Sequence, residues 1–152
     1  MNSYEELLAK VRTIAEADLR SEDKMQAVTA LLAADVEGFD CVAFFLIDPD
    51  NPRQLLIGPR SGAGLTPTHI AIGQGICGQV AEHAITIVVD DVTQELNYLP
   101  GHPDTRSEIV LPVFRSGQVV AELDVNSFQF ARFQTQERLF LEELCLLLTD
   151  RI

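Results

Sequence analysis

The feature that most constrains this chain is a change in hydrophobic period near residue 40. Before it, apolar residues recur every three or four positions over residues 3–20 and 21–38, as in amphipathic helices. Ser3 and Glu6 have the spacing of a capping box at the start of the first segment. After residue 40 the apolar runs are short and are separated by turn-forming residues. The pattern predicts two helices followed by a sheet.

Tight turns connect the predicted strands. The run Cys41–Ile47 is apolar and rich in β-formers, and Asp and Pro residues follow it at 48–52. A partner strand is expected at Gln54–Gly58, and the Gly-, Pro- and Ser-rich segment 59–67 is expected to be a loop. These features predict a first hairpin.

The clearest hairpin joins residues 108–114 to residues 118–125, because Gly117 can adopt the positive φ of a tight turn. The remaining expected elements are a strand at 69–72, a helix at 79–84, a strand at 85–89, a loop at 90–106 and a last helix from Gln134 or Thr135 to Leu148. Strands joined by hairpins form antiparallel sheets, with helices gathered on one side. The predicted class is α+β.

Length and charge limit the possible functions. The 152 residues predict a single domain over 1–152, with an N-terminal helix over 1–20 and a core over 25–150. The net charge of −12 opposes contact with phosphate backbones and anionic lipids, so neither nucleic acid nor membrane is an expected partner. The acidic N-terminal segment does not look like a secretory signal. We therefore expect a cytoplasmic protein.

The three cysteines, Cys41, Cys77 and Cys145, lie far apart in the sequence. An odd number without CxxC spacing is typical of reduced thiols rather than of a disulfide framework. The three histidines are also scattered, so the sequence spacing predicts no metal site and no cofactor.

Five short motifs occur in a specific order: Gly73-Gln-Gly-Ile-Cys-Gly78, Asp90-Asp-Val92, Pro100-Gly-His102, Ser107-Glu-Ile-Val-Leu-Pro112 and Leu123-Asp-Val-Asn-Ser127. Together they resemble a GAF domain, and within that superfamily the branch that contains the free methionine-(R)-sulfoxide reductases. The resemblance implies a six-stranded antiparallel sheet. The N- and C-terminal helices would pack on one face, often forming a homodimer, and a loop-covered ligand pocket would lie on the other face.

The resemblance also implies three cysteine positions for the reductases, of which this chain keeps one, Cys77. Ten residues upstream stands Pro67, and the loop at 103–106 contains no cysteine. Sulfoxide reduction needs an attacking thiolate and a resolving thiol. Cys41 in a strand and Cys145 in the last helix are not expected to serve. The sequence therefore predicts a domain without redox catalysis.

Glu108 and Asp124 match the carboxylates with which the reductases hold their substrate, whereas Asn126 stands where they have a second aspartate. With Cys77, these residues are expected to contact a small polar metabolite. In the long loop, Tyr98 would form a lid and His102 would contact the ligand.

Each of these features also has a purely structural interpretation. Cys77 would then be a small buried side chain, and Glu108 and Asp124 would lie on a solvated sheet face. Gly73-x-Gly75 could cradle a phosphate or simply form a tight turn. Three functions follow: a ligand-binding sensor domain, a reductase-like enzyme with altered cysteines, and a structural dimerisation module.

Overall fold

The computed structural model describes residues 3–152, so the first two residues of the expected domain lie outside the described residues. Its helices are α1 (Tyr4–Glu16), α2 (Ser21–Asp35), α3 (Gly75–His83), α4 (Thr135–Leu148) and a short 3-10 helix, η1 (Val92–Gln94). Its strands are β1 (Cys41–Asp48), β2 (Asn51–Gly62), β3 (His69–Ala71), β4 (Ile87–Val89), β5 (Ser107–Arg115) and β6 (Gln118–Ser127).

The six strands form one sheet in the order β3-β2-β1-β6-β5-β4, and every neighbouring pair is antiparallel. The predicted β5–β6 hairpin turns at Ser116 and Gly117, which both have positive φ, as a type I′ turn requires. The α+β class and the six-stranded antiparallel sheet are thus confirmed.

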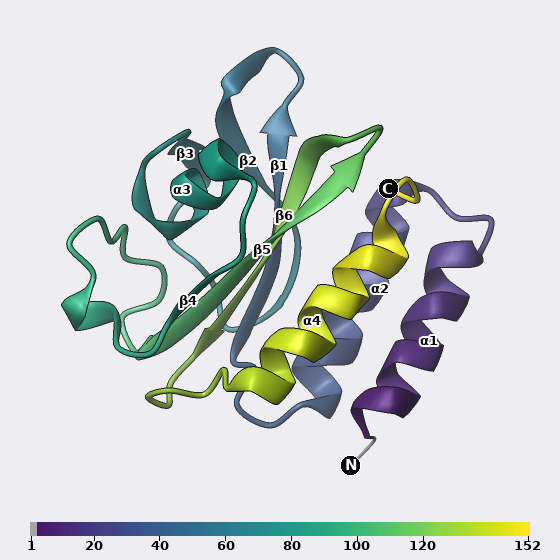
Figure 1. Ribbon diagram of the computed structural model, residues 1–152, viewed down its shortest axis with the longest axis horizontal. Helices are drawn as coiled ribbons and strands as arrows, with labels where there is room; N and C mark the ends of the chain where they lie inside the picture. Colours follow the sequence, from purple (N-terminus) through teal and green to yellow (C-terminus); the bar gives the residue numbers. More distant parts are fainter. Residues whose placement is uncertain (1–2) are drawn as a thin grey trace.

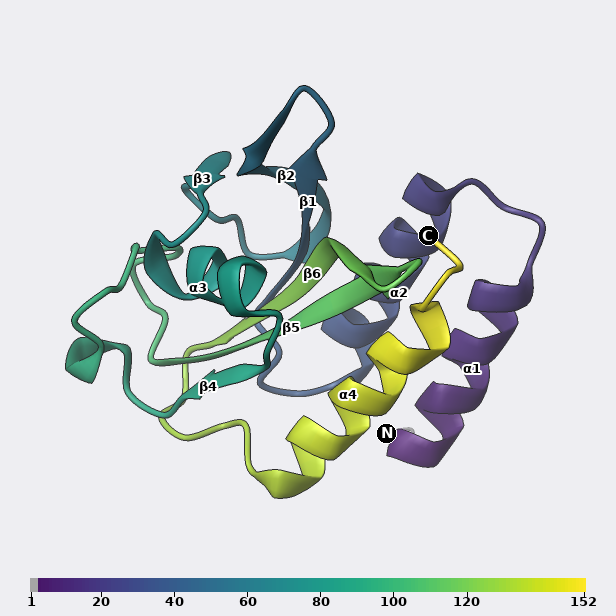
Figure 2. The ribbon, with the colours of Figure 1, turned by 45° about the horizontal axis from the view of Figure 1, so that its top comes forward.

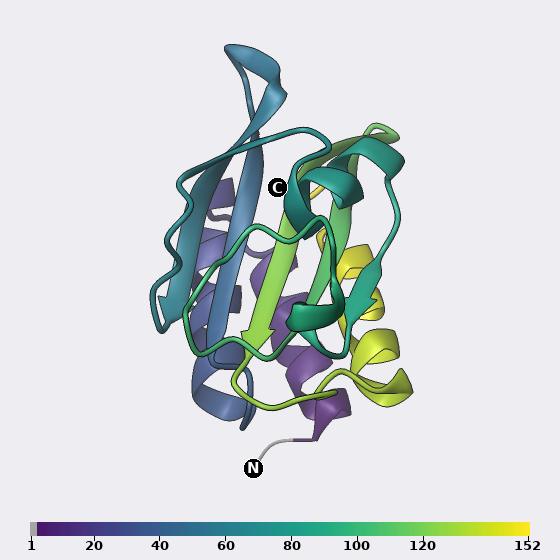
Figure 3. The same cartoon turned by 90° about the vertical axis from the view of Figure 1, so that its left-hand side faces the viewer.

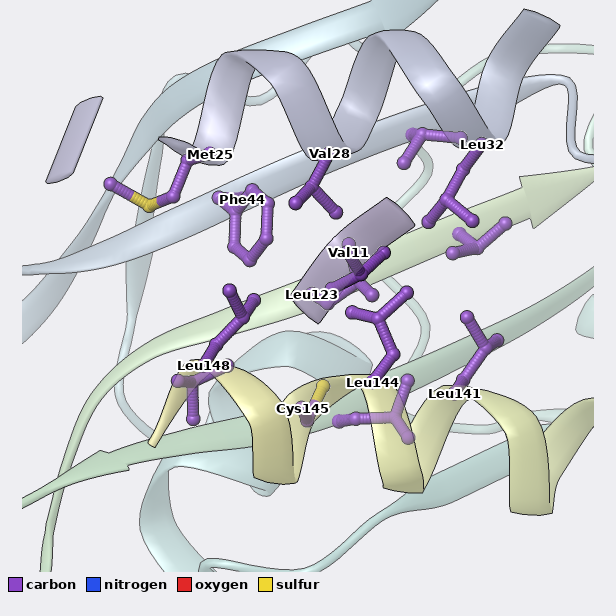
Figure 4. Packing of buried hydrophobic residues seen from close by; sticks show 14 of the residues in the cluster. Val11, Met25, Val28, Leu32, Phe44, Leu123, Leu141, Leu144, Cys145 and Leu148 are labelled. Atoms are coloured by element: carbon purple, nitrogen blue, oxygen red, sulfur yellow. The ribbon is translucent and has the colours of Figure 1, made fainter. Parts of the chain in front are cut away.

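Helices α1, α2 and α4 lie together on one face of the sheet (Figures 1 and 2). Alternate residues of the central strands point into this layer, because side chains of a strand alternate between faces. Phe44 of β1 and Leu123 of β6 are fully buried there, between Val28 of α2 and Leu144 of α4 (Figure 4). This layer is the main hydrophobic core.

The opposite face carries α3 and the segment 90–106, which runs across the central strands (Figure 3). A second, smaller core forms here around Phe45, Ile70, Ile76 and Val110. The candidate site lies within this second layer.

Strand β2 and helix α3 both extend beyond their expected bounds. Residues 60–62 pair with Ala43, Val42 and Cys41, so half of the expected loop 59–67 belongs to the strand. The pairing shifts register between Ala43 and Phe45, where Pro59 cannot donate to the ladder. Helix α3 begins at Gly75 rather than at Gln79, because its first turn is built on glycines that propensity alone does not assign to a helix.

The apolar stripe of α4 is divided between the core and the surface. Phe140, Leu141, Leu144 and Leu148 are buried, and Phe140 stacks on Tyr4 of α1 at 4.3 Å between ring centroids. Leu139 and Leu146 remain 59% and 71% exposed. A homodimer through the terminal helices stays a prediction. No helix in the described part of the chain combines the length and apolarity needed to cross a membrane.

Candidate ligand site

The site is built on a row of polar side chains along β6. Glu122, Asp124 and Asn126 occupy alternate positions, so all three face the α3 layer, while Leu123 and Val125 face the helices. The register of β5 against β6 places Glu108 directly opposite Asn126. Strand pairing therefore brings three carboxyl groups and one amide onto a single patch of the sheet.

All four side chains of this patch are buried, with Glu122 at 0%, Asn126 at 1%, Asp124 at 3% and Glu108 at 5% exposure. The solvated-face interpretation of Glu108 and Asp124 is therefore wrong. Buried carboxyl groups need partners, because removing a charged group from water is costly.

Asn126 joins two of the carboxyl groups. Its Nδ2 donates to Asp124 Oδ1 at 2.9 Å and, more weakly, to Glu108 Oε2 at 3.4 Å. The Thr105 hydroxyl donates to Asn126 Oδ1 at 3.0 Å, which fixes the orientation of the amide. The amide thus holds Asp124 and Glu108 in position.

Cys77 comes to this patch from α3, above the sheet. Its Sγ donates to Asp124 Oδ2 at 3.6 Å, and its donor atom lies within 4.8 Å of carboxylate oxygens of both Glu108 and Asp124. Burial raises the pKa of the Cys77 thiol well above its ordinary value, and the charge of Asp124 raises it further. The cysteine is therefore held as a thiol rather than a thiolate in this state.

Burial also raises the pKa values of the three carboxyl groups. The pKa of Glu108 rises well above its usual range through burial and then through the charge of Asp124. Burial likewise raises the pKa of Asp124, and its hydrogen-bonding neighbours partly offset the rise. Within residues 3–152, no Lys, Arg or His forms an ion pair with any of them. The site is acidic, and none of the described residues 3–152 provides it with a cationic partner.

Glu122 was not among the residues expected to form the site. Both of its carboxylate oxygens are buried without a hydrogen-bond partner in the described part of the chain. Burial raises the pKa of Glu122 well above the usual range, and the charge of Asp124 raises it further. The nearby Cys77 thiol partly offsets this rise. The thiol does not form a hydrogen bond to Glu122, since its Sγ donates to Asp124. The signal for Glu122 in the sequence was its two-residue spacing from Asp124.

The cavity over this patch has a volume of about 20 Å³. Cys77, Glu108 and Asp124 line it, and its walls are largely apolar, with Phe45, Leu65, Pro67, Ile70, Ile76 and Leu99 among them. A space of this size holds about one water molecule. The loop side chains therefore close the pocket almost completely in this state.

Asn97 fastens the long loop to the start of α3. Its Oδ1 accepts a hydrogen bond from Gly75 N, and its Nδ2 donates to Gly73 O, both at 2.9 Å. The N–H groups of Gly73 and Gly78 are bonded to backbone carbonyls. Because these N–H groups are occupied within the chain, Gly73-x-Gly75 forms a tight turn and not an open phosphate cradle.

Replacing Asn97 with alanine is expected to release the loop, since two hydrogen bonds to the Gly73-x-Gly75 turn are lost. We expect a loss of about 1–2 kcal/mol in the free energy of unfolding and faster amide exchange over residues 95–104. Leu96→Ala is the matched control, because Leu96 is fully exposed in the same loop. Equal exchange in the two variants would contradict the role of Asn97.

The other predicted site residues occupy different places. Tyr98 is half-buried; burial and the charge of Glu108 raise its pKa to about 12, so its hydroxyl stays protonated. His102 does not line the cavity: its ring packs on Phe128 at 4.8 Å between centroids, and its Nδ1 accepts from Asp104 N. Cys145 lies in the helical core.

Cys41 is the first residue of β1. It lies opposite Asn126, so it faces the same side of the sheet as the acidic patch. Burial and the charge of Asp124 raise its pKa to about 12. Its position within the strand gave no indication of which face it would occupy.

Comparison with known proteins agrees with this architecture. A GAF domain family model matches residues 20–152. GAF domain-containing protein A of Dictyostelium discoideum is 29% identical over 147 residues, covering 97% of this chain and 90% of that protein. The free methionine-R-sulfoxide reductase of Saccharomyces cerevisiae is 27% identical over 118 residues, covering 77% of this chain and 63% of the yeast protein.

Among solved structures, a free methionine-R-sulfoxide reductase from Neisseria meningitidis in complex with its substrate superimposes with a TM-score of 0.88. It is 30% identical in sequence, and the match covers 95% of this chain and 85% of the Neisseria chain. Fold, motif order and family match agree, and the chain belongs to the GAF domain family.

Proposed function

We propose that the chain is a ligand-binding GAF domain that takes up a small polar metabolite carrying a cationic group and does not reduce it. The observation that carries this proposal is the buried cluster of Glu108, Glu122 and Asp124, which has no cationic partner within residues 3–152. An ammonium group would supply the missing opposite charge through charge-assisted hydrogen bonds.

The cysteine thiols present at the cavity argue against reduction of a bound sulfoxide. Pro67, which the motif resemblance places where the reductases have a cysteine, lines the cavity. Thr105, in the loop where the resemblance places the catalytic cysteine, donates its hydroxyl to Asn126. Cys77 remains, but its raised pKa keeps it a poor nucleophile. Cys41 shares the face but pairs with Asn126, and it is not among the donors that converge with Cys77.

The reductase-like enzyme remains the second candidate, because relatives with that activity in their names match most of this chain. The two candidates predict different outcomes for one compound. A binding domain would take up free methionine-(R)-sulfoxide, or another amino acid, and release it unchanged. An enzyme would turn it over with an external thiol, and Cys77→Ser would abolish the turnover.

Ligand entry requires movement of the loop 90–106, since about 20 Å³ cannot hold a metabolite. The loop crosses the sheet on the side of the site (Figure 3), contributes Leu99 and Gly101 to the cavity walls, and is fastened by side-chain hydrogen bonds of Asn97. Opening and closing of this loop would couple ligand binding to a change in the shape of the surface.

The test is a thermal-shift screen of amino acids and small amines, run with a chelator present. A ligand at 100 times its Kd should add about 2.7 kcal/mol to the free energy of unfolding. We expect Asp124→Asn to weaken binding by at least about tenfold, since a buried charge partner is lost. The exposed Asp104→Asn, in the loop, is the matched control.

Two results would overturn the proposal. Turnover of methionine-(R)-sulfoxide that requires Cys77 would identify an enzyme. An absence of any stabilising ligand, with Asn97→Ala also failing to bind one, would favour a structural dimerisation module with a collapsed pocket.

A further inference from the structure

Three potential metal ligands converge at the small cavity over the acidic patch, although they are scattered along the sequence. Donor atoms of Cys77, Glu108 and Asp124 all lie within 4.8 Å of one another, and all three residues are buried. They come from α3, β5 and β6. Chain spacing could not reveal this group, because a metal motif is recognised only when its ligands are neighbours in sequence.

An independent observation points to a ligand at this place. Glu122 is fully buried, faces the same side of β6 as Asp124, and has two carboxylate oxygens without a hydrogen-bond partner in the described residues. The groups that act on it electrostatically are Cys77 and Asp124. An orphaned buried carboxyl group beside three converging donors indicates that the cluster lacks a positively charged partner.

We propose that Cys77, Glu108, Asp124 and Glu122 form a binding site for a single divalent transition-metal ion of the Zn²⁺ class. This inference does not depend on metabolite binding. It concerns the closed state, whose cavity of about 20 Å³ has room for an ion but none for a metabolite.

The donor set determines the class of ion. Thiolate sulfur and carboxylate oxygen are both ligands that Zn²⁺ accepts, whereas Mg²⁺ and Ca²⁺ prefer all-oxygen sites. In a tetrahedral zinc site, neighbouring ligand atoms are about 3.3–3.8 Å apart. The donor atoms of Cys77, Glu108 and Asp124, which lie within 4.8 Å of one another, would need to approach by at most about 1–1.5 Å to reach these separations.

Asn126 would position the ligands without binding the metal. It donates to Asp124 Oδ1 and Glu108 Oε2 and is itself held by Thr105. Such outer hydrogen bonds orient ligands in metal sites, and their loss weakens metal binding by about 10- to 100-fold. The polar network around the cluster is thus suited to hold two carboxylates against one ion.

The experiment uses Co²⁺ as a spectroscopic substitute for Zn²⁺, added to the full chain after removal of metal with a chelator and under reducing conditions. We expect one Co²⁺ per chain, with a sulfur-to-cobalt charge-transfer band and the visible absorption of a four-coordinate ion. Added Zn²⁺ should abolish both signals, because Zn²⁺ would occupy the same ligands.

Variants assign the ligands. Cys77→Ser should eliminate the charge-transfer band and weaken Co²⁺ binding by at least about tenfold, whereas Cys145→Ser, a buried cysteine on the opposite face, should change neither. Glu122→Gln keeps the thiol and should weaken binding by a similar factor while retaining the band. If circular dichroism shows that Cys77→Ser does not fold, the Glu122→Gln variant tests whether the cluster binds Co²⁺.

The proposal is overturned if the wild-type chain shows no charge-transfer band at stoichiometric Co²⁺, or if folded Cys77→Ser binds Co²⁺ as tightly as wild type. Either result would mean that the carboxyl groups are simply kept protonated. A metabolite screen with a chelator present is unaffected by these outcomes, so failure of the metal site and failure of metabolite binding are distinguishable.

Discussion

Gly78→Ala is expected to destabilise the protein by about 2–3 kcal/mol, although alanine is the better helix former. A Cβ at residue 78 would lie 2.5 Å from Ala71 O and 2.9 Å from Gly73 N, both backbone atoms that cannot rotate away. Helix propensity favours alanine over glycine by about 1 kcal/mol. Because the clash is with backbone atoms, the cost of overpacking lies at or above the upper end of the usual range, about 3–4 kcal/mol, and outweighs this gain.

The destabilisation should appear as a decrease in Tm of about 5–10 °C for a chain of this size. Because Gly78 follows Cys77, a displaced α3 should also increase thiol reactivity at Cys77, which can be measured with a thiol reagent. Gly64→Ala is the control, since its Cβ would meet nothing within 4 Å. A Gly78→Ala protein as stable as wild type would contradict the close packing of α3 on β3.

Elements of the fold that depend on local sequence features were predictable, and those that depend on contacts between distant segments were not. The β5–β6 hairpin was predictable because both the alternation of its strands and the Gly117 turn are local features. The true end of β2 and the true start of α3 were not. Residues 60–62 pair with the start of β1, which lies far from them in the sequence, and Gly75 starts α3 with a positive φ while its N–H donates to Asn97 of the long loop. These are tertiary effects.

The residues that meet at the candidate site were predictable only in part. The motifs indicate Glu108, Asp124, Asn126 and Cys77. The sheet register brings the first three together, and α3 places Cys77 above them. Glu122 was missed because a single glutamate in a strand looks like a solvated residue until its face is known to be buried. Its two-residue spacing from Asp124 was the available signal, and it becomes meaningful only once the orientation of β6 is fixed.

Glu122→Gln is expected to stabilise the metal-free protein, and the gain should grow with pH. The ordinary pKa of this carboxyl group is 4.5, and burial raises it well above that value in the folded state. A group with a raised folded-state pKa contributes its full stability below the unfolded pKa, and that contribution is lost as pH rises toward the folded pKa. The free energy of unfolding of the wild type therefore decreases above about pH 4.5, as Glu122 ionises more readily in the unfolded state. The glutamine variant has no carboxyl group at this position and does not show this decrease.

The measurement is Tm with a chelator present at about pH 5.5 and about pH 8.5. A gain of about 2 kcal/mol at the higher pH corresponds to an increase of about 4–8 °C, and the gain should be smaller at the lower pH. Glu143→Gln, at an exposed glutamate of α4, should change Tm little at either pH.

With saturating Zn²⁺ the wild type should become more stable than Glu122→Gln, because the wild type then gains a bound ion that the variant binds weakly. Lower stability of Glu122→Gln at both pH values without metal would mean that Glu122 has a stabilising partner, and the buried cluster would then not be short of positive charge.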